Sequence, residues 1–355
     1  MGKALARNVG MKLLIVTQAV DQNDPILGFF CRWLTEFAKQ LESIEVICLR
    51  EGAHSLPANV HVYSLGKPAS RIYYVARFGW LIWKLRPKYD AVFVHMNPEY
   101  VILGGLDWRL MGKKIYFWYN HPNKDLRFKI AARLADKIFY TSRYSAGAKM
   151  PHALRMPAGI DTDLFKPQPV TRIQHALYMQ GRITPSKHIK VALEALRLVR
   201  KEISGATLTL VGPEDPVYGT KLRKEFSDLL QAGAVVFVGP KPNSETPTLY
   251  STHSISINLA DNGHYDKSVL ESIACGTPVV LYSKAFSSGH PREVIAPNEI
   301  LIKERTPEKL AEMVLFVIRE YPRWENEVAR ARGVVIVRES LAALSQGLLG
   351  AMYTL

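Results

Sequence analysis

Residues 254–282 read SISINLADNGHYDKSVLESIACGTPVVLY, and this stretch decides the fold. Ile255 and Ile257 alternate with polar residues, as in a short strand, and residues 279–281 have the length of a second, buried strand. Between them a polar loop precedes residues 267–274, whose apolar side chains recur at helical spacing before a glycine that ends the helix. The order strand, loop, helix, strand predicts one unit of a parallel sheet.

The carboxyl edge of such a sheet favours phosphate as a ligand, because unpaired backbone N–H groups and the positive end of the helix dipole meet there. Glu271 lies about one turn into the predicted helix, where its carboxylate can accept hydrogen bonds from vicinal hydroxyls such as those of a ribose. Any parallel sheet has such an edge. The pattern alone therefore leaves a purely structural interpretation open.

Two segments resemble the signature of glycosyltransferase family 4. VLESIACGTPVV, residues 269–280, resembles the family's glutamate, small-residue helix and GxPVV, and Gly181-Arg182 followed by Lys187 resembles its GR-x4-K segment. The phrases MPAGIDTDLF and TLVGP are also similar to the family. The resemblance implies the two-domain fold called GT-B, retention of anomeric configuration and no required metal.

Composition places the chain among ordinary globular proteins: of 355 residues, 48% are hydrophobic and 22% are charged. Three isolated cysteines indicate neither a zinc site nor a disulfide framework, so a reducing, cytoplasmic setting is expected. No apolar run approaches the roughly 20 residues that cross a bilayer, and the N-terminus lacks the apolar core of a signal peptide.

Strand-like and helical patterns alternate along the chain, which predicts an α/β fold of two Rossmann-like, doubly wound parallel-sheet domains facing a cleft. We assign residues 1–168 to an N-terminal acceptor domain and residues 169–335 to a C-terminal nucleotide-sugar donor domain. The resemblance implies that a helix in residues 336–355 packs back on the N-terminal domain. Further helices are expected at residues 28–41, 187–201 and 218–231, and strands at residues 12–17, 45–49, 60–64, 91–95, 114–118, 137–140, 176–179, 207–211, 235–238, 254–258 and 278–281.

The net charge of +14 is concentrated in the N-terminal half, where residues 1–165 contain 23 Lys and Arg against 13 Asp and Glu. An anionic membrane surface or an anionic substrate would explain this excess. A nucleic-acid partner is not expected, since no DNA- or RNA-binding motif accompanies the charge. Residues 71–88, RIYYVARFGWLIWKLRPK, fit either a core helix with a basic last turn or a helix lying in a membrane interface.

Transfer of a sugar from a nucleotide donor places negative charge on the departing phosphate, so fixed cations are needed. Arg182 and Lys187 are the candidates, because Arg binds phosphate oxygens through a bidentate fork and Lys acts as a point charge. The resemblance adds His121 as a catalytic candidate that contacts the sugar or orients the acceptor. His95 and Glu99 are candidates for the acceptor or sugar region. For both histidines a hydrogen-bonded loop histidine is the alternative.

The chain departs from the family at Gly263, eight positions before Glu271, where many members have a glutamate that helps to hold the donor sugar. Asp266 and Lys267 are expected to contact sugar hydroxyls and phosphates instead, with a helix-capping Asp266 as the structural alternative. The predicted donor-binding residues are Gly28, Gly181, Gly212, Pro213, Gly263, His264, Tyr265, Asp266, Lys267, Ser268, Val269 and Glu271.

The predicted function is that of a retaining hexosyltransferase. It uses a nucleotide-diphosphate sugar, UDP-linked first and GDP-mannose second, and a hydroxyl of a glycan, lipid-linked or small-molecule acceptor. The donor is a substrate, no cofactor or metal is expected, and the expected place is the cytoplasm or the inner face of an anionic membrane. Two alternatives stay open: a nucleotide-sugar epimerase on the same fold, and a non-catalytic nucleotide-sugar-binding relative. A dehydrogenase is disfavoured, because no GxGxxG follows either first strand.

Overall fold

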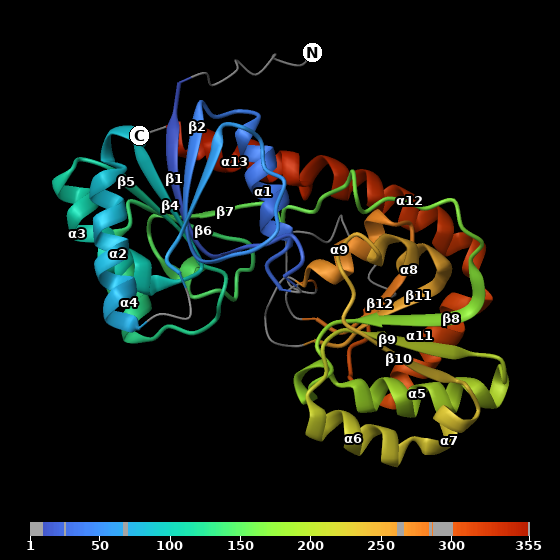
Figure 1. The fold of residues 1–355 in the computed structure, drawn as a ribbon. Helices are drawn as coiled ribbons and strands as arrows, with labels where there is room; N and C mark the ends of the chain where they lie inside the picture. The colour runs from blue at the N-terminus through green and yellow to red at the C-terminus, as the bar shows by residue number, and fades with distance from the viewer. Residues whose placement is uncertain are drawn as a thin grey trace, which may run out of the picture. The chain divides into compact units, whose positions relative to one another are not determined.

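The computed structural model describes residues 10–24, 26–66, 70–260, 266–283, 286 and 301–353. The chain divides into two compact units, residues 1–159 with 341–355 and residues 160–340. Each unit contains a parallel sheet flanked by helices, so the predicted α/β class with two Rossmann-like sheets is confirmed (Figure 1). The division falls at residues 159 and 340, whereas the sequence places it at residues 168 and 335.

In the first unit the described strands pair in the order β3-β2-β1-β4-β5-β6-β7. This is a doubly wound order, in which the chain adds strands outward from β1 to β3 on one side and from β4 to β7 on the other, so the strand order reverses between β1 and β4. They are β1 (Lys12–Val20), β2 (Ser43–Glu51), β3 (Val60–Ser64), β4 (Ala91–His95), β5 (Lys114–Trp118), β6 (Lys137–Tyr140) and β7 (Ala153–Arg155). The sequence pattern does not predict β7, because three residues are too short to show an alternation.

Successive residues of β1 face two separate cores. Leu13 and Ile15 belong to the core that includes side chains of α1 (Phe29–Ala38) and α13 (Leu341–Tyr353). Leu14 and Val16 belong to the core on the opposite face. That face carries α2 (Arg71–Lys84), α3 (Pro98–Leu110) and α4 (Leu126–Leu134), and the short 3-10 turns of the unit are η1 (Arg86–Lys88) and η2 (Gly147–Lys149) (Figure 1).

The last helix, α13, completes the first unit although it follows the second unit in sequence. Its Leu344 and Leu348 are buried in the same core as α1. The Tyr116 hydroxyl donates to the carbonyl of Met352 at 2.8 Å, and Lys137 Nζ donates to the carbonyl of Ala351 at 2.7 Å. Packing of α13 therefore joins the end of the chain to the first sheet.

In the second unit the order is β10-β9-β8-β11-β12, again reversing next to its first strand. The strands are β8 (Ile173–Gln180), β9 (Thr207–Val211), β10 (Val235–Gly239), β11 (His253–Asn258) and β12 (Val279–Leu281). The helices and turns are η3 (Pro185–Lys187), α5 (Ile189–Glu202), α6 (Pro216–Glu225), α7 (Ser227–Gln231), α8 (Thr246–Thr252), α9 (Lys267–Ala274), α11 (Pro307–Arg319) and α12 (Tyr321–Arg338).

Two predicted helices of this unit differ in the structure. The helix expected from residue 187 begins at Ile189, because His188 takes a left-handed conformation with φ 54° that separates η3 from α5. The helix expected over residues 218–231 is two helices that meet at Phe226, whose φ of −116° interrupts the helical path. Apolar spacing continues across both breaks, so the sequence pattern does not reveal them.

Residues 71–88 form α2 and η1 rather than one core helix. Phe78, Leu81 and Ile82 are buried against the sheet, whereas Trp80 and Trp83 are 55% and 43% exposed. The interpretation of residues 71–88 as a core helix therefore holds for one face of α2 only.

Candidate functional site

The candidate donor site lies at the carboxyl edge of the second sheet, where the strand order reverses. β8 leads into Gly181 and Arg182, and the adjacent β11 leads toward Asp266 at the start of α9. Ligands of doubly wound sheets bind in the crevice at this point. The predicted residues Gly263, His264 and Tyr265 lie outside the described residues.

Two glycines bring the loops after β8 and β9 into contact. Gly212 has φ +146°, and a Cβ there would lie 2.1 Å from the carbonyl oxygen of Gly181. A Cβ on Gly181 would lie 3.1 Å from Cε of Lys187. The Ile183 N–H donates to the carbonyl of Pro213 at 2.9 Å, which fixes the two loops together. A side chain at residue 212 would separate them, so the edge presents bare backbone.

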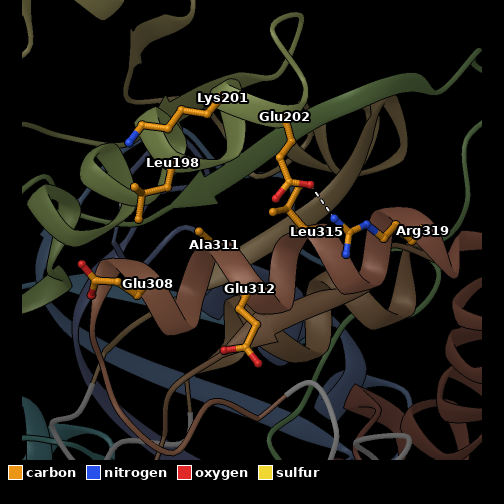
Figure 2. Close-up of a pocket in the computed structure, with 8 residues that line it drawn as sticks. All are labelled: Leu198, Lys201, Glu202, Glu308, Ala311, Glu312, Leu315 and Arg319. Atoms are coloured by element: carbon orange, nitrogen blue, oxygen red, sulfur yellow. Dashed lines mark hydrogen bonds and ion pairs between the residues drawn. The ribbon is translucent and has the colours of Figure 1, made fainter.

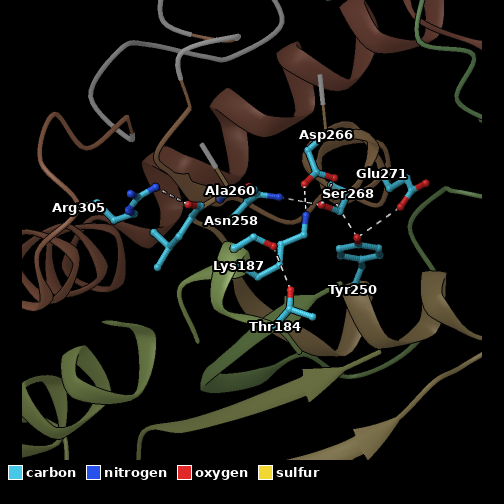
Figure 3. A network of polar contacts seen from close by, with 11 residues as sticks. Thr184, Lys187, Tyr250, Asn258, Ala260, Asp266, Ser268, Glu271 and Arg305 are labelled. Carbon is cyan, nitrogen blue, oxygen red and sulfur yellow. Dashed lines mark hydrogen bonds and ion pairs between the residues drawn. The ribbon is translucent and has the colours of Figure 1, made fainter. Parts of the chain in front are cut away.

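Lys187 and Asp266 form the central contact of the site. Lys187 Nζ lies 2.5 Å from Asp266 Oδ2, and the two side chains are only 14% and 19% exposed (Figure 3). Lys187 comes from η3 after β8, and Asp266 precedes α9 after β11, so the ion pair crosses the point where the strand order reverses. Asp266 occupies the N-cap position of α9, yet its carboxylate makes no capping hydrogen bond. It holds Lys187 instead.

Further hydrogen bonds fix the carboxylate of Asp266. The Ser268 hydroxyl donates to Asp266 Oδ1 at 3.1 Å and accepts from Asn258 Nδ2 at 2.9 Å (Figure 3). Burial raises the pKa of Asp266, but the Lys187 charge and these hydrogen bonds outweigh burial and hold the pKa below its ordinary value of 3.8. Asp266 is therefore ionised near neutral pH and keeps the Lys187 ammonium in one place.

Glu271 and Lys267 lie one turn apart on α9, and both are half-buried. The hydroxyl of Tyr250 is 3.5 Å from Glu271 Oε2 and 3.2 Å from the carbonyl oxygen of Ser268 (Figure 3). Burial raises the pKa of Glu271 and lowers the pKa of Lys267, while each of the two favours the charged form of the other. Glu271 is thus a half-buried hydrogen-bonding group on α9.

Other predicted donor residues differ in exposure. Arg182 is exposed at the end of β8, where an incoming anion can reach its guanidinium. Val269 is fully buried, so its side chain supports α9 and does not line a binding surface. The sequence thus places both residues near the edge, but only Arg182 presents its side chain to solvent.

In the first unit the two candidate histidines follow neighbouring strands but differ in exposure. His95 ends β4 and is buried, with its ring stacked on Phe30 at 4.4 Å and its Nδ1 3.4 Å from the Thr17 hydroxyl. His121 follows β5 and is exposed, and its Nδ1 accepts from the Asn123 N–H at 3.0 Å. Of the two histidines, only His121 presents its ring to solvent.

Glu99 and Gly28 have local structural roles. Glu99, in the first turn of α3, lies 2.7 Å from Arg127 of α4. A Cβ on Gly28 would lie 2.7 Å from the carbonyl oxygen of Asp24. The close approach of the backbone within this loop therefore explains why residue 28 is a glycine. Both residues remain predictions as binding groups.

Sequence reasoning missed two residues that organise the site. Tyr250 is fully buried in α8 and reaches α9, and Asn258 ends β11. One signal points to Asn258, since it is the polar residue at which the alternation of polar and apolar residues ends before the loop. No such signal points to Tyr250, because its hydrogen-bond partners lie about 20 residues later in the chain, beyond a strand and a loop.

A separate hollow lies between α5 and α11, away from the candidate site (Figure 2). The Glu202 carboxylate and the Arg319 guanidinium form an ion pair across it. Its α5 residues begin at Leu198, roughly 14 Å along the helix from the end nearest Lys187. The lining residues are Leu198, Lys201, Glu202, Glu308, Ala311, Glu312, Leu315 and Arg319.

Comparisons with known proteins include a family match over the part of the chain that contains this site. Residues 164–333 match the family model described as Glycosyl transferases group 1. The GDP-mannose-dependent alpha-(1-6)-phosphatidylinositol monomannoside mannosyltransferase of Mycobacterium tuberculosis is 26% identical over 197 residues, 49% of this chain and 48% of the relative. The D-inositol 3-phosphate glycosyltransferase of Acidothermus cellulolyticus is 29% identical over 150 residues, 38% of this chain and 34% of the relative. The chain thus spans about half the length of these relatives or less.

Solved structures match nearly the whole chain. Anabaena Alr3699/HepE in complex with UDP-glucose has a TM-score of 0.76 and 16% identity, with 97% of this chain and 100% of that chain covered. WaaG, a glycosyltransferase involved in lipopolysaccharide biosynthesis, has a TM-score of 0.68 and 15% identity, with coverage of 95% and 98%. At these identities the likeness shows the fold, which is GT-B. Residues 164–333 thus resemble group 1 glycosyltransferases, and the fold of the whole chain is similar to that of the GT-B glycosyltransferases.

Proposed function

We propose that this protein transfers a hexosyl group from a nucleotide-diphosphate sugar to an acceptor hydroxyl and retains the anomeric configuration. The observation that carries the proposal is Lys187, whose ammonium is fixed by Asp266 where the strand order reverses. A cation that is oriented before the donor arrives needs no rearrangement when charge develops on the leaving group.

The reaction breaks the bond between the anomeric carbon and the terminal phosphate oxygen of the donor, and negative charge grows on the diphosphate. Lys187 and Arg182 bind these oxygens, and the N-terminus of α9 adds its dipole. The bare backbone at Gly181 and Gly212 leaves room for the diphosphate. Glu271 accepts hydrogen bonds from ribose hydroxyls.

The acceptor attacks from the face that the diphosphate leaves. Its oxygen bonds to the anomeric carbon as the phosphate departs through an ion-pair-like state, and its proton passes to the leaving phosphate oxygen. His121 donates a hydrogen bond to the sugar or orients the acceptor. Because Lys187 and Arg182 supply positive charge at the diphosphate, the reaction is expected to proceed in EDTA.

For the donor we propose GDP-mannose and UDP-glucose as the pair to test first. The sequence-based preference is for UDP, whereas mannosyltransferase relatives that match by sequence are GDP-mannose-dependent. For the acceptor we propose a lipid-linked or cell-envelope glycan, which the phosphatidylinositol mannoside in the names of those relatives supports.

The test is a thermal-shift series with UDP, GDP and ADP and their sugar conjugates, followed by nucleotide release with candidate acceptors. A ligand at about 100 times its dissociation constant adds about 2.7 kcal/mol of stability. Stabilisation by one base together with acceptor-dependent release supports the proposal. Conversion of the sugar without an acceptor would identify an epimerase, and binding without release would identify a non-catalytic relative.

A further inference from the structure

The outward surface of α2, α3 and α4 exposes an unusual amount of apolar side chain. Among the described residues, nineteen large hydrophobic side chains are exposed, and ten of them belong to these three helices of the first unit. Exposed apolar patches of this kind mark interaction sites. We call this surface the α2–α4 face; its apolar residues are Ile72, Tyr73, Val75, Trp80, Trp83, Leu103, Leu106, Leu110, Leu126 and Ile130.

Contacts between the helices show that the α2–α4 face is one surface. Trp83 Nε1 of α2 donates to the Asp107 carboxylate of α3 at 3.2 Å. Arg109 of α3 donates to the carbonyl of Arg133 in α4 at 3.1 Å. The three helices lie side by side over one side of the first sheet (Figure 1). The exposed apolar residues thus share a continuous outward layer.

The outward side chains of the α2–α4 face lie outside the core of the unit. In α2 the buried residues are Phe78, Leu81 and Ile82, which pack in the core below. In α3, Leu106 and Leu110 are 66% and 74% exposed, opposite the buried Trp108 side of the helix. Exposure of such apolar side chains to water is unfavourable, so their apolar character points to a partner.

The charge on the same face selects the kind of partner. α2, η1, α3 and α4 contain nine Lys and Arg but only two acids, Glu99 and Asp107. Both acids already have partners, since Glu99 pairs with Arg127 and Asp107 accepts from Trp83. The uncompensated charge of the face is therefore positive.

Cations also lie against the exposed aromatic rings. Lys84 Nζ is 4.4 Å from the centre of the Trp80 ring, and the Arg86 guanidinium is 5.7 Å from that of Trp83. Tryptophan with adjacent Lys or Arg suits a membrane interface, where the ring reaches the acyl boundary and the cation meets lipid phosphate. No helix in the described part of the chain is long and apolar enough to span a bilayer.

We propose that the α2–α4 face docks on the surface of an anionic lipid bilayer. The apolar residues enter the interface, and the surrounding cations bind anionic headgroups. Two copies of this face would bring like charges together, so a lipid surface explains the residues better than self-association does. The proposal concerns binding alone and stands independently of the transferase reaction.

The test is co-sedimentation of the full chain with phosphatidylcholine vesicles that contain either no or one-third phosphatidylglycerol, at low and high salt. Retention is expected on the anionic vesicles at low salt, with a blue shift of tryptophan fluorescence. Trp80→Ser combined with Leu106→Ser removes apolar contacts, and Lys84→Gln combined with Lys129→Gln removes two cations. Each lost cation should weaken partitioning about fivefold.

Matched controls come from the second unit, where Val217 is 82% exposed and Lys221 is exposed. Val217→Ser with Lys221→Gln should leave retention unchanged. Failure of the wild type to bind anionic vesicles, or equal binding by all variants, would overturn the proposal. A concentration-dependent dimer that the Trp80→Ser substitution abolishes would also overturn the proposal. Turnover of a soluble acceptor should persist in every variant, so a failed docking face and a failed transferase are distinguishable.

Discussion

Single residues determine where charge lies in the candidate donor site. Lys187 is held by Asp266, whose other oxygen accepts from Ser268, while Arg182 remains exposed at the end of β8. One cation is therefore fixed and the other accessible. This division suits a diphosphate, because one group can position the anion while the other closes on it.

Lys187→Ala should lower the rate of hexosyl transfer about 10²-fold or more, because one preorganised charge is lost at the leaving group. Lys190→Ala is the matched control, since Lys190 lies three residues on and pairs with Glu225 instead. Steady-state turnover of both variants with a saturating donor measures the effect. A Lys187→Ala variant within a few-fold of the wild type would remove this lysine from the mechanism.

The Asp266→Asn substitution should make the free energy of unfolding depend less on pH in the acidic range. The pKa of Asp266 is lower in the folded protein than its ordinary 3.8, so its ionised form stabilises the fold above that value. The contribution is lost as pH falls through 3.8 toward the lower, folded pKa. Denaturant unfolding from pH 6 to pH 3 should show a smaller loss for Asp266→Asn than for the wild type. Exposed Asp163→Asn should follow the wild type, and identical profiles for all three proteins would contradict the assignment.

At the scale of elements, the site depends on how closely two loops approach. The loops after β8 and β9 are hydrogen-bonded through Ile183 and Pro213, and Gly212 permits the contact. α9 then brings Asp266 and Glu271 from the other side of the reversal in strand order. Each element alone is ordinary, and their meeting creates the candidate donor site.

Gly212→Ala should weaken nucleotide binding and destabilise the fold, because its Cβ would lie 2.1 Å from the carbonyl oxygen of Gly181 and φ is +146°. Gly205→Ala is the control, since nothing lies within 4 Å of its Cβ position. Nucleotide titration and thermal unfolding measure the two effects. Equal affinity and stability in both variants would show that the loops need not be this close.

At the scale of the whole molecule, the chain returns to its first unit through α13. Leu344 and Leu348 are fully buried there, and a Cβ on Gly159 would lie 2.4 Å from Leu344. The first unit is therefore completed only after the second has been synthesised.

Leu344→Ala combined with Leu348→Ala should destabilise the first unit by several kcal/mol, since each buried Leu→Ala change costs about 2–5 kcal/mol. The nucleotide should still stabilise the second unit, whose site contains no α13 residue. Thermal unfolding with and without nucleotide measures both effects. Val337→Ala, at a position 73% exposed on α12, should change neither. Unchanged unfolding of the double variant would contradict this role of α13.

The sequence by itself determined the local elements and the chemistry at their ends. The α9 bounds, residues 267–274, are those predicted, and the expected strands at residues 60–64, 91–95, 114–118, 137–140 and 207–211 have identical bounds in the structure. These features follow from apolar periodicity and from glycine and polar residues at element ends, which are properties of neighbouring residues.

Tertiary structure alone decided which distant side chains meet and which face is covered. Lys187 and Asp266 pair across 79 positions, His95 is buried while His121 is exposed, and α2 leaves Trp80 in solvent. Local periodicity shows that a face is apolar but not what lies against it. That depends on strand order and helix packing, which bring together residues far apart in the chain.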